Sequence, residues 1–178
     1  MPTPTTLPGS FTAGDVLTAA NMNNLRGAFR ILQVAQSAKT DTSTMSGTTF
    51  TNIPGLSVTI TPYSNTSKFL LLTQVNYGSN GQPVMMRFSG GNSGNYVGDA
   101  AGNRIRTAID ADGESLVSML NIMFFYLDSP ATASAITYTV QARVGNANTF
   151  YINRSNTDTD DNTFQRAASN LVVLEVSA

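Results

Sequence analysis

Two short acidic segments contain the residues of this chain whose types and spacing could do chemistry. Asp158–Asn162 reads DTDDN, and hard cations such as Ca²⁺ bind clustered carboxylate oxygens. Asp110–Glu114 reads DADGE, and two carboxylate groups brought together could act as the acid and base of a glycosidase. The first segment lacks the glycine and the bidentate glutamate of an EF-hand loop, so we expect a solvated acidic loop. Nothing in the sequence places the two segments together, and we expect the second to be a turn.

The chain contains no histidine and no cysteine. Most nucleophile–base arrangements need one of these two residue types, so only carboxylate, lysine or tyrosine chemistry remains. We therefore expect no enzymatic activity, no catalytic residue, no cofactor and no metal site. The formal net charge is −1 and the basic residues are scattered, which argues against a nucleic-acid partner. No apolar run approaches the ~18 residues of a membrane span, so no membrane partner is expected either.

Threonine, serine and asparagine together make up 57 of the 178 residues, whereas charged residues make up only 12%. Ordinary soluble domains contain about 25% charged residues. Threonine suits the solvent-facing side of a β-strand, while serine and asparagine suit turns. The composition predicts an all-β protein with a neutral, hydroxyl- and amide-rich surface.

Alternation of apolar and polar residues predicts the strands that would position any site. Ile136–Val144 alternates strictly, which is typical of a strand with one buried face. Other short strands are expected with turns between them at ~8–15-residue spacing. Together they predict an antiparallel β-sandwich, a jelly roll in its finer topology. The other expected strands are Ile31–Gln36, Thr48–Ile53, Leu56–Ile60, Phe69–Tyr77, Val84–Phe88, Arg104–Ile109, Leu116–Leu127, Phe150–Asn153 and Leu171–Val176, with a hairpin turn at Asp110–Gly113 and a glycine-rich loop at Ser89–Gly102.

Leu116–Leu127 is apolar at both odd and even positions, unlike a strand that buries one face. A strand with two apolar faces indicates that the second face meets another subunit, because homo-oligomer interfaces are rich in apolar and aromatic groups. The predicted subunit interface consists of Met123, Phe124, Phe125 and Tyr126. Phe69–Tyr77 is also apolar at both parities at its start, and it is expected to be a central strand covered on both sides.

Residues 1–30 are expected to form an arm outside the globular domain, which would comprise residues 31–178. The segment Met1–Gly14 is rich in proline and threonine, which favours an extended backbone. A short helix capped by Thr18 follows, and its opposite face is rich in asparagine, so alone it would be marginal in water. We predict that the arm anchors the protein to a larger particle; a helix folded back onto its own domain is the open alternative. The anchoring residues would be Phe11, Val16, Leu17, Met22, Leu25 and Phe29.

The segment Phe11–Leu25, FTAGDVLTAANMNNL, resembles the opening of many bacteriophage virion proteins, in which an F-x-A-G-x-V/L-L-T-A-x-x-x-N-x-L pattern precedes a fibre or decoration domain. Ile31–Gln36, Gly55–Thr61, Leu127–Val144 and Ala168–Val176 are similar to a domain of tail-fibre-like and head-decorating proteins of marine and cyanobacterial phages. The resemblance implies a virion structural protein, typically a trimer. It does not extend to residues 78–114.

The expected function is therefore that of a homotrimeric capsid decoration, or cement, protein on the head of the virion. Its partners would be copies of itself and the major capsid protein. The chain is short and contains no repeats or coiled coil that would give a fibre its reach. The alternative is a short tail fibre or receptor-binding protein, with Ser89–Gly102 and Arg154–Gln165 in contact with host surface glycans.

Overall fold

The computed structural model describes residues 14, 16, 18–19, 31–112 and 117–177. Every regular element in these residues is a strand, apart from one short 3-10 turn. The described residues contain no helix that is long and apolar enough to cross a membrane. The predicted helix after Thr18 falls largely outside the described residues. The elements are β1 (Ile31–Lys39), β2 (Ser43–Ser46), β3 (Thr51–Ile60), β4 (Lys68–Ser79), β5 (Pro83–Ser89), η1 (Ser93–Asn95), β6 (Ile109–Asp112), β7 (Leu120–Asp128), β8 (Ile136–Val144), β9 (Thr149–Ile152) and β10 (Ser169–Val176).

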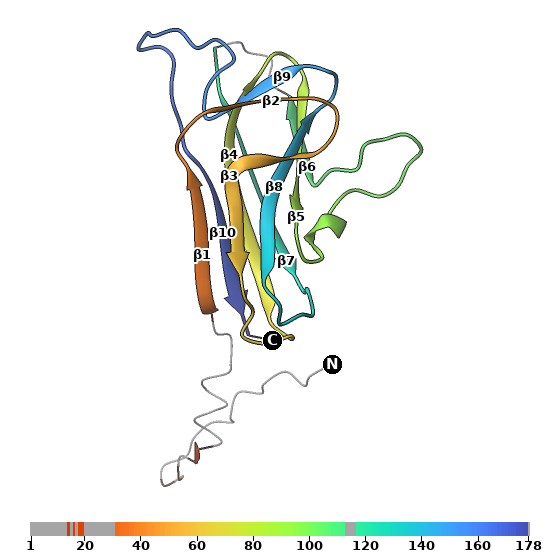
Figure 1. The fold of residues 1–178 in the computed structure, drawn as a ribbon, viewed down its shortest axis with the longest axis vertical. Coiled ribbons are helices and arrows are strands. Elements are labelled where there is room, and N and C mark those ends of the chain that lie inside the picture. The colour runs from red at the N-terminus through yellow and green to blue at the C-terminus, as the bar shows by residue number, and fades with distance from the viewer. Residues whose placement is uncertain (1–13, 15, 17, 20–30, 113–116, 178) are drawn as a thin grey trace.

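The strands form two sheets that face each other as a sandwich (Figure 1). The larger sheet has six strands in the order β1-β10-β4-β9-β2, with β7 paired to the free side of β4. The smaller sheet has four strands in the order β3-β8-β5-β6. All strand pairs are antiparallel, so the prediction of an antiparallel sandwich is confirmed.

The strand pairs are nested along the chain. The first strand, β1, pairs with the last, β10, and β3 pairs with β8. Inside these, β4 pairs with β7 and β5 with β6. The chain therefore behaves like one long folded hairpin whose pairs lie alternately in the larger and the smaller sheet. The short strands β2 and β9 extend the larger sheet at the end away from Ile31 (Figure 1).

The core between the sheets is built from the alternating positions that the sequence indicates. On β8, Ile136, Tyr138, Val140, Ala142 and Val144 are all buried, and the strand has the predicted bounds. The largest buried side chains are aromatic, and tilted ring pairs join the sheets, as where Phe88 of β5 meets Phe124 of β7 with centroids 4.4 Å apart. Fully buried aromatic residues are Tyr77, Tyr138, Phe69, Phe88 and Phe150.

Several local predictions are wrong. The strands expected at Thr48–Ile53 and Leu56–Ile60 belong to one strand, β3, because its pairing with β8 continues on both sides of an irregularity between Asn52 and Ser57. The segment Arg104–Ile109 is a loop until its last residue, and Asp110–Asp112 belongs to strand β6 instead of a turn. The reason is tertiary: β6 pairs with β5 through Met85 and its neighbours, a long-range contact that overrides the local turn preference of aspartate. A further error concerns β7, which begins at Leu120, after the residues that were expected to start it.

Candidate functional site

The outer face of the larger sheet is apolar across four adjacent strands. Side chains directly opposite each other in antiparallel strands lie on one face, so the register defines rows across β1, β10, β4 and β7. The first row contains only aliphatic residues, and the second and third rows mix apolar with amide side chains. These rows are Val34–Leu174–Leu70–Leu127, Gln36–Val172–Leu72–Phe125 and Ala38–Asn170–Gln74–Met123. We call these twelve residues the apolar face.

Large side chains of the apolar face are open to solvent in the single chain. Met123 is 67% exposed, Phe125 66% and Leu127 48%. Phe125 and Met123 border a shallow depression between β4 and β7 of about 270 Å³. The central position predicted for the Phe69–Tyr77 strand is correct, since β4 lies between β10 and β7. The prediction that it is covered on both faces is wrong for the single chain, because Leu72 remains exposed.

The outer face of the smaller sheet has the opposite character. Asn52, Gln141 and Arg87 form one row there, joined by hydrogen bonds from Gln141 Nε2 to Asn52 Oδ1 (2.9 Å) and from Arg87 Nε to Gln141 Oε1 (3.0 Å). Further along, the hydroxyl groups of Thr59 and Thr137 lie 2.8 Å apart. An outer face covered by hydrogen-bonded polar side chains is stable in contact with water. Of the two sheets, the larger one therefore has the exposed apolar outer face.

The alternation of β7 divides the four predicted interface residues between two faces. Met123 and Phe125 point outward on the apolar face. Phe124 is 6% exposed and packs against Phe88 inside the sandwich. Tyr126 is partly buried and stacks on the ring of Tyr96, with centroids 4.7 Å apart. In the single chain, only Met123 and Phe125 of this set are therefore available to a partner.

Of the six predicted anchoring residues, the structure describes only Val16, which is 82% exposed. Phe11, Leu17, Met22, Leu25 and Phe29 lie outside the described residues.

The carboxylates of the Asp158–Asn162 segment contact groups close to them in the chain. Asp158 accepts contacts from Arg166 Nη2 (2.8 Å) and, more distantly, from Arg154 Nε (3.8 Å). Asp161 accepts a hydrogen bond from the backbone N–H of Thr163, and this bond lowers the pKa of the Asp161 carboxyl. Within the part of the chain that the structure describes, no group of three or more histidine, cysteine, aspartate or glutamate side chains is placed to hold a metal ion.

Asp110 and Asp112 affect the pKa of a buried tyrosine, Tyr77. Both lie on β6, and their charges add to the effect of burial in raising the pKa of Tyr77 above its usual value. The hydroxyl of Tyr77 donates to the backbone oxygen of Ala111 (2.9 Å). This arrangement fixes β6 against β4 and presents no open acid–base pair.

A second buried tyrosine anchors the start of the glycine-rich loop. The hydroxyl of Tyr138 donates to Asp128 Oδ2 (2.7 Å), which also accepts from the backbone N–H of Asn92 (3.1 Å). Burial and the bond to Asp128 raise the pKa of Tyr138. A Cβ added to Gly91, whose φ is +53°, would lie 2.2 Å from the Asp128 carboxylate, so this position requires glycine.

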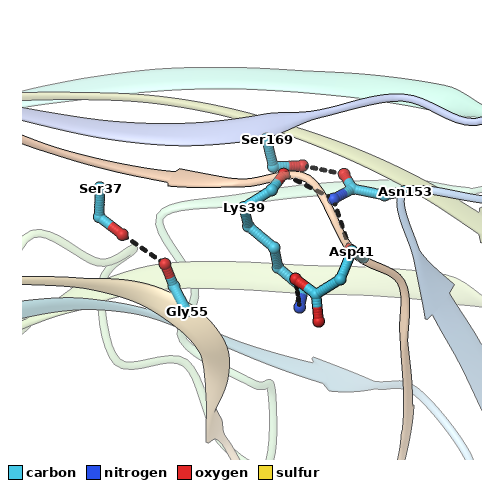
Figure 2. Close-up of polar contacts among 6 residues, drawn as sticks. All are labelled: Ser37, Lys39, Asp41, Gly55, Asn153 and Ser169. Atoms are coloured by element: carbon cyan, nitrogen blue, oxygen red, sulfur yellow. Dashed lines mark hydrogen bonds and ion pairs between the residues drawn. The ribbon is translucent and has the colours of Figure 1, made fainter.

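A polar cluster that sequence reasoning missed ties β1 to β9 and β10 (Figure 2). Asn153 follows β9 and is fully buried, and its Nδ2 donates to the backbone oxygens of Lys39 (2.8 Å) and Asp41 (2.9 Å). Its Oδ1 accepts from the hydroxyl of Ser169 (2.6 Å). Asn153 has φ +63°, a left-handed conformation that asparagine tolerates better than most residues. The sequence analysis placed Asn153 at the end of the expected strand Phe150–Asn153, whereas β9 ends at Ile152 and Asn153 follows it.

The same cluster places a lysine inside the protein. Lys39 is 3% exposed, and its Nζ contacts Asp41 Oδ1 at 3.0 Å. Its aliphatic stem lies over Gly55, whose backbone oxygen accepts a hydrogen bond from Ser37 of β1 (Figure 2). The cluster therefore fixes edge strand β1, which carries Val34 of the apolar face, to the strands on either side.

The Lys39–Asp41 pair predicts a small dependence of stability on pH. The hydrogen bond from Lys39 lowers the pKa of the Asp41 carboxyl below its usual value. The pair therefore stabilises the fold above about pH 4, and this contribution is lost as the pH falls through the lower pKa of the folded state. The free energy of unfolding of Asp41→Asn should be lower than that of the natural chain at pH 7, with the difference shrinking below pH 4. A difference that stays constant to pH 2 would contradict the role of the pair.

No protein-family model matches this chain, and no curated protein matches it.

Proposed function

We propose that this chain is a structural protein of a bacteriophage virion, a homotrimeric decoration protein of the capsid. The proposal depends above all on the apolar face, an uncovered surface that runs across four strands of the larger sheet. A role in assembly accounts for such a face, because large exposed apolar patches mark surfaces that bind other proteins. The proposed role is structural and includes no catalytic step.

The strand topology supports a jelly roll, the finer description of the sandwich. Nested pairing places β1, β10, β4 and β7 in one sheet and β3, β8, β5 and β6 in the other, eight strands in two antiparallel layers. Eight strands in two antiparallel layers are also the architecture of jelly rolls, which occur in viral capsid proteins and lectins, and this likeness supports the finer description. The topology is thus compatible with a virion protein, although fold by itself does not determine function.

The proposed mechanism is mechanical. Copies of the body associate through the apolar face, and residues 1–30 attach each copy to the major capsid protein. Stable protein–protein interfaces bury about 800 Å² on each partner, so the association must involve most of the apolar face. Because the bound protein holds neighbouring capsid subunits together, mass action stabilises the assembled shell.

A short tail fibre or receptor-binding protein is the second candidate. The observation that favours it is Tyr96, whose ring stacks on Tyr126 and lines a depression with Gly98 and Thr107 at the base of a projecting loop (Figure 1). An exposed aromatic ring can stack on a host glycan. Two other tyrosines are not open to a glycan in this way: Tyr77 is in the core, and Arg154 covers the ring of Tyr151 at 3.6 Å.

Deletion of residues 1–30 should leave a folded β-sandwich that no longer attaches to particles. The described strands begin at Ile31, and the core residues all follow it. The measurement is co-sedimentation of the full and truncated chains with particles that lack the protein, together with circular dichroism of the truncated chain. Attachment of the truncated chain would remove the arm from the mechanism.

Immunogold labelling of purified particles separates the two candidates. Label distributed over the head is expected for a decoration protein, whereas label confined to the tail tip supports the receptor-binding candidate. Absence of the protein from particles would contradict both.

A further inference from the structure

Two arginines on the outer face of the smaller sheet lie against one phenylalanine ring. The guanidinium carbon of Arg87, on β5, is 4.2 Å from the centroid of the Phe50 ring, and that of Arg143, on β8, is 5.9 Å from it. Arg143 is opposite Met85 in the strand register, so Arg87, two residues further along β5, is its diagonal neighbour. The two positive charges therefore share one small area of the sheet.

Neither guanidinium group has an anionic partner in the described part of the chain. The Nε atoms donate to neutral acceptors, which are Gln141 Oε1 for Arg87 (3.0 Å) and the backbone oxygen of Val144 for Arg143 (3.4 Å). The Nη atoms of both arginines have no acceptor among the described residues. The area therefore contains strong hydrogen-bond donors without acceptors, and two like charges that repel each other.

The carboxylate nearest to the arginines in the strand register, Asp110, does not neutralise them. Asp110 is opposite Met85 on β6, which places it diagonal to Arg87 and two strands away from Arg143. Among the described residues, no ion pair joins Asp110 to either arginine. The guanidinium group of Arg87 reaches toward Phe50, which precedes β3, and hence away from β6.

We propose that the arginine site, which consists of Arg87, Arg143 and Phe50, binds the carboxylate or sulfate groups of an acidic polysaccharide. Guanidinium groups bind such oxyanions through paired N–H donors, and stacking on an aromatic ring holds them in position beforehand. A bound oxyanion accepts the free Nη hydrogens and offsets the repulsion between the two cations. This inference does not depend on the proposed function, and the site lies on the sheet opposite the apolar face.

The surroundings of the arginine site favour a polysaccharide over other polyanions. The same face carries the amides of Asn52 and Gln141 and, further along, the hydroxyl groups of Thr59 and Thr137. Such groups donate to and accept from sugar hydroxyls, whereas the core of a protein interface is enriched in apolar and aromatic side chains. A nucleic acid requires a larger basic surface than two arginines in a chain of net charge −1.

Three dextrans with the same backbone test the proposal on the full chain: dextran sulfate, carboxymethyl dextran and uncharged dextran. Isothermal titration calorimetry at low salt measures the affinity for each polymer. At least one acidic dextran should bind, and uncharged dextran should not. Because salt screens exposed charges, the affinity should fall about tenfold between about 0.05 and 0.5 M NaCl. Binding that is insensitive to salt would overturn the proposal.

Variants locate the binding on the surface. The double variant Arg87→Gln/Arg143→Gln should lower the affinity for the acidic dextran about tenfold or more, because its charge-assisted hydrogen bonds are lost. Lys68→Gln/Arg104→Gln removes the same charge from two exposed positions elsewhere and should bind like the natural chain. Asp110→Asn should bind more tightly, since it removes the negative charge diagonal to Arg87. This third variant decides the question if circular dichroism shows that the first does not fold.

Four results would overturn the proposal. The first is an absence of binding to both acidic dextrans, and the second is an equal loss of affinity in the two double variants. The third is an Asp110→Asn variant that binds no more tightly than the natural chain. The fourth is a different ligand: inorganic sulfate that binds as well as dextran sulfate at equal sulfate concentration would define a free-anion site, and poly-glutamate that binds more tightly than either acidic dextran would make an acidic protein the occupant.

Discussion

Replacement of Phe125 by aspartate is expected to give a folded monomer. Phe125 lies in the middle row of the apolar face and is 66% exposed in the single chain, so the carboxylate is solvated when the copies are apart. In the assembly the same carboxylate would be buried without a cation, which costs far more than the lost apolar contact. Sedimentation velocity should show loss of the oligomer at concentrations where the natural chain is assembled, with an unchanged circular dichroism spectrum.

Replacement of the neighbouring Phe124 should have a different outcome. Phe124 is 6% exposed and packs on Phe88, so Phe124→Asp removes core contact and buries a charge inside the sandwich. Large-to-small changes at buried phenylalanines cost about 3–5 kcal/mol, and the charge adds to this, against a total stability of about 5–15 kcal/mol. We expect unfolded or aggregated protein. Thr59→Asp, on the polar outer face of the smaller sheet, is the control that should remain folded and assembled. A folded Phe124→Asp, or an assembled Phe125→Asp, would contradict the assignment of faces on β7.

Replacement of Asn153 by alanine should lower the free energy of unfolding by about 3–5 kcal/mol. The backbone oxygens of Lys39 and Asp41 would each lose a donor, and Ser169 would lose its acceptor. Each buried group left without a partner costs about 1–3 kcal/mol, and alanine is also strained at φ +63°. Urea denaturation of the two proteins measures the difference.

Two variants separate the contributions at this position. Asn153→Gly keeps the left-handed backbone and loses only the side-chain bonds, so its loss should be smaller than that of Asn153→Ala. Asn146→Ala removes an exposed bond to Gln82 Oε1 (2.7 Å) and should change stability by less than about 1 kcal/mol. Equal effects of Asn153→Ala and Asn146→Ala would show that the cluster does not brace β1.

Sequence patterns located most strands because alternation is a local signal. The segment Ile136–Val144 has the bounds of β8, and the buried residues are those of the predicted parity. The pattern failed at Arg104–Asp112, where a four-residue strand exists only because β5 provides an edge for it to pair with. It also missed Asn153, because a buried amide that bonds two strands distant in sequence leaves no periodic signal.

The sequence predicted that β7 has an uncovered apolar surface, but it did not predict which of its residues form that surface. Two apolar faces on one strand indicated an uncovered surface on β7, and Met123 and Phe125 do point outward there. Which of four consecutive apolar residues faces the core could not be read from a run that is apolar at both parities. The continuation of the surface onto Leu72, Val172 and Val34 depends on strand register, which only pairing defines.

By itself, the sequence determined that the chain forms antiparallel strands with one apolar and one polar face. Side chains alternate between the two faces of a strand, so alternating apolar and polar residues place the apolar ones together. Only the tertiary structure decided which strands are neighbours, and hence that scattered aliphatic residues of β1, β10, β4 and β7 combine into one apolar surface. That surface depends on hydrogen bonds between segments far apart in the chain, as between β1 and β10, whose pairing no local pattern encodes.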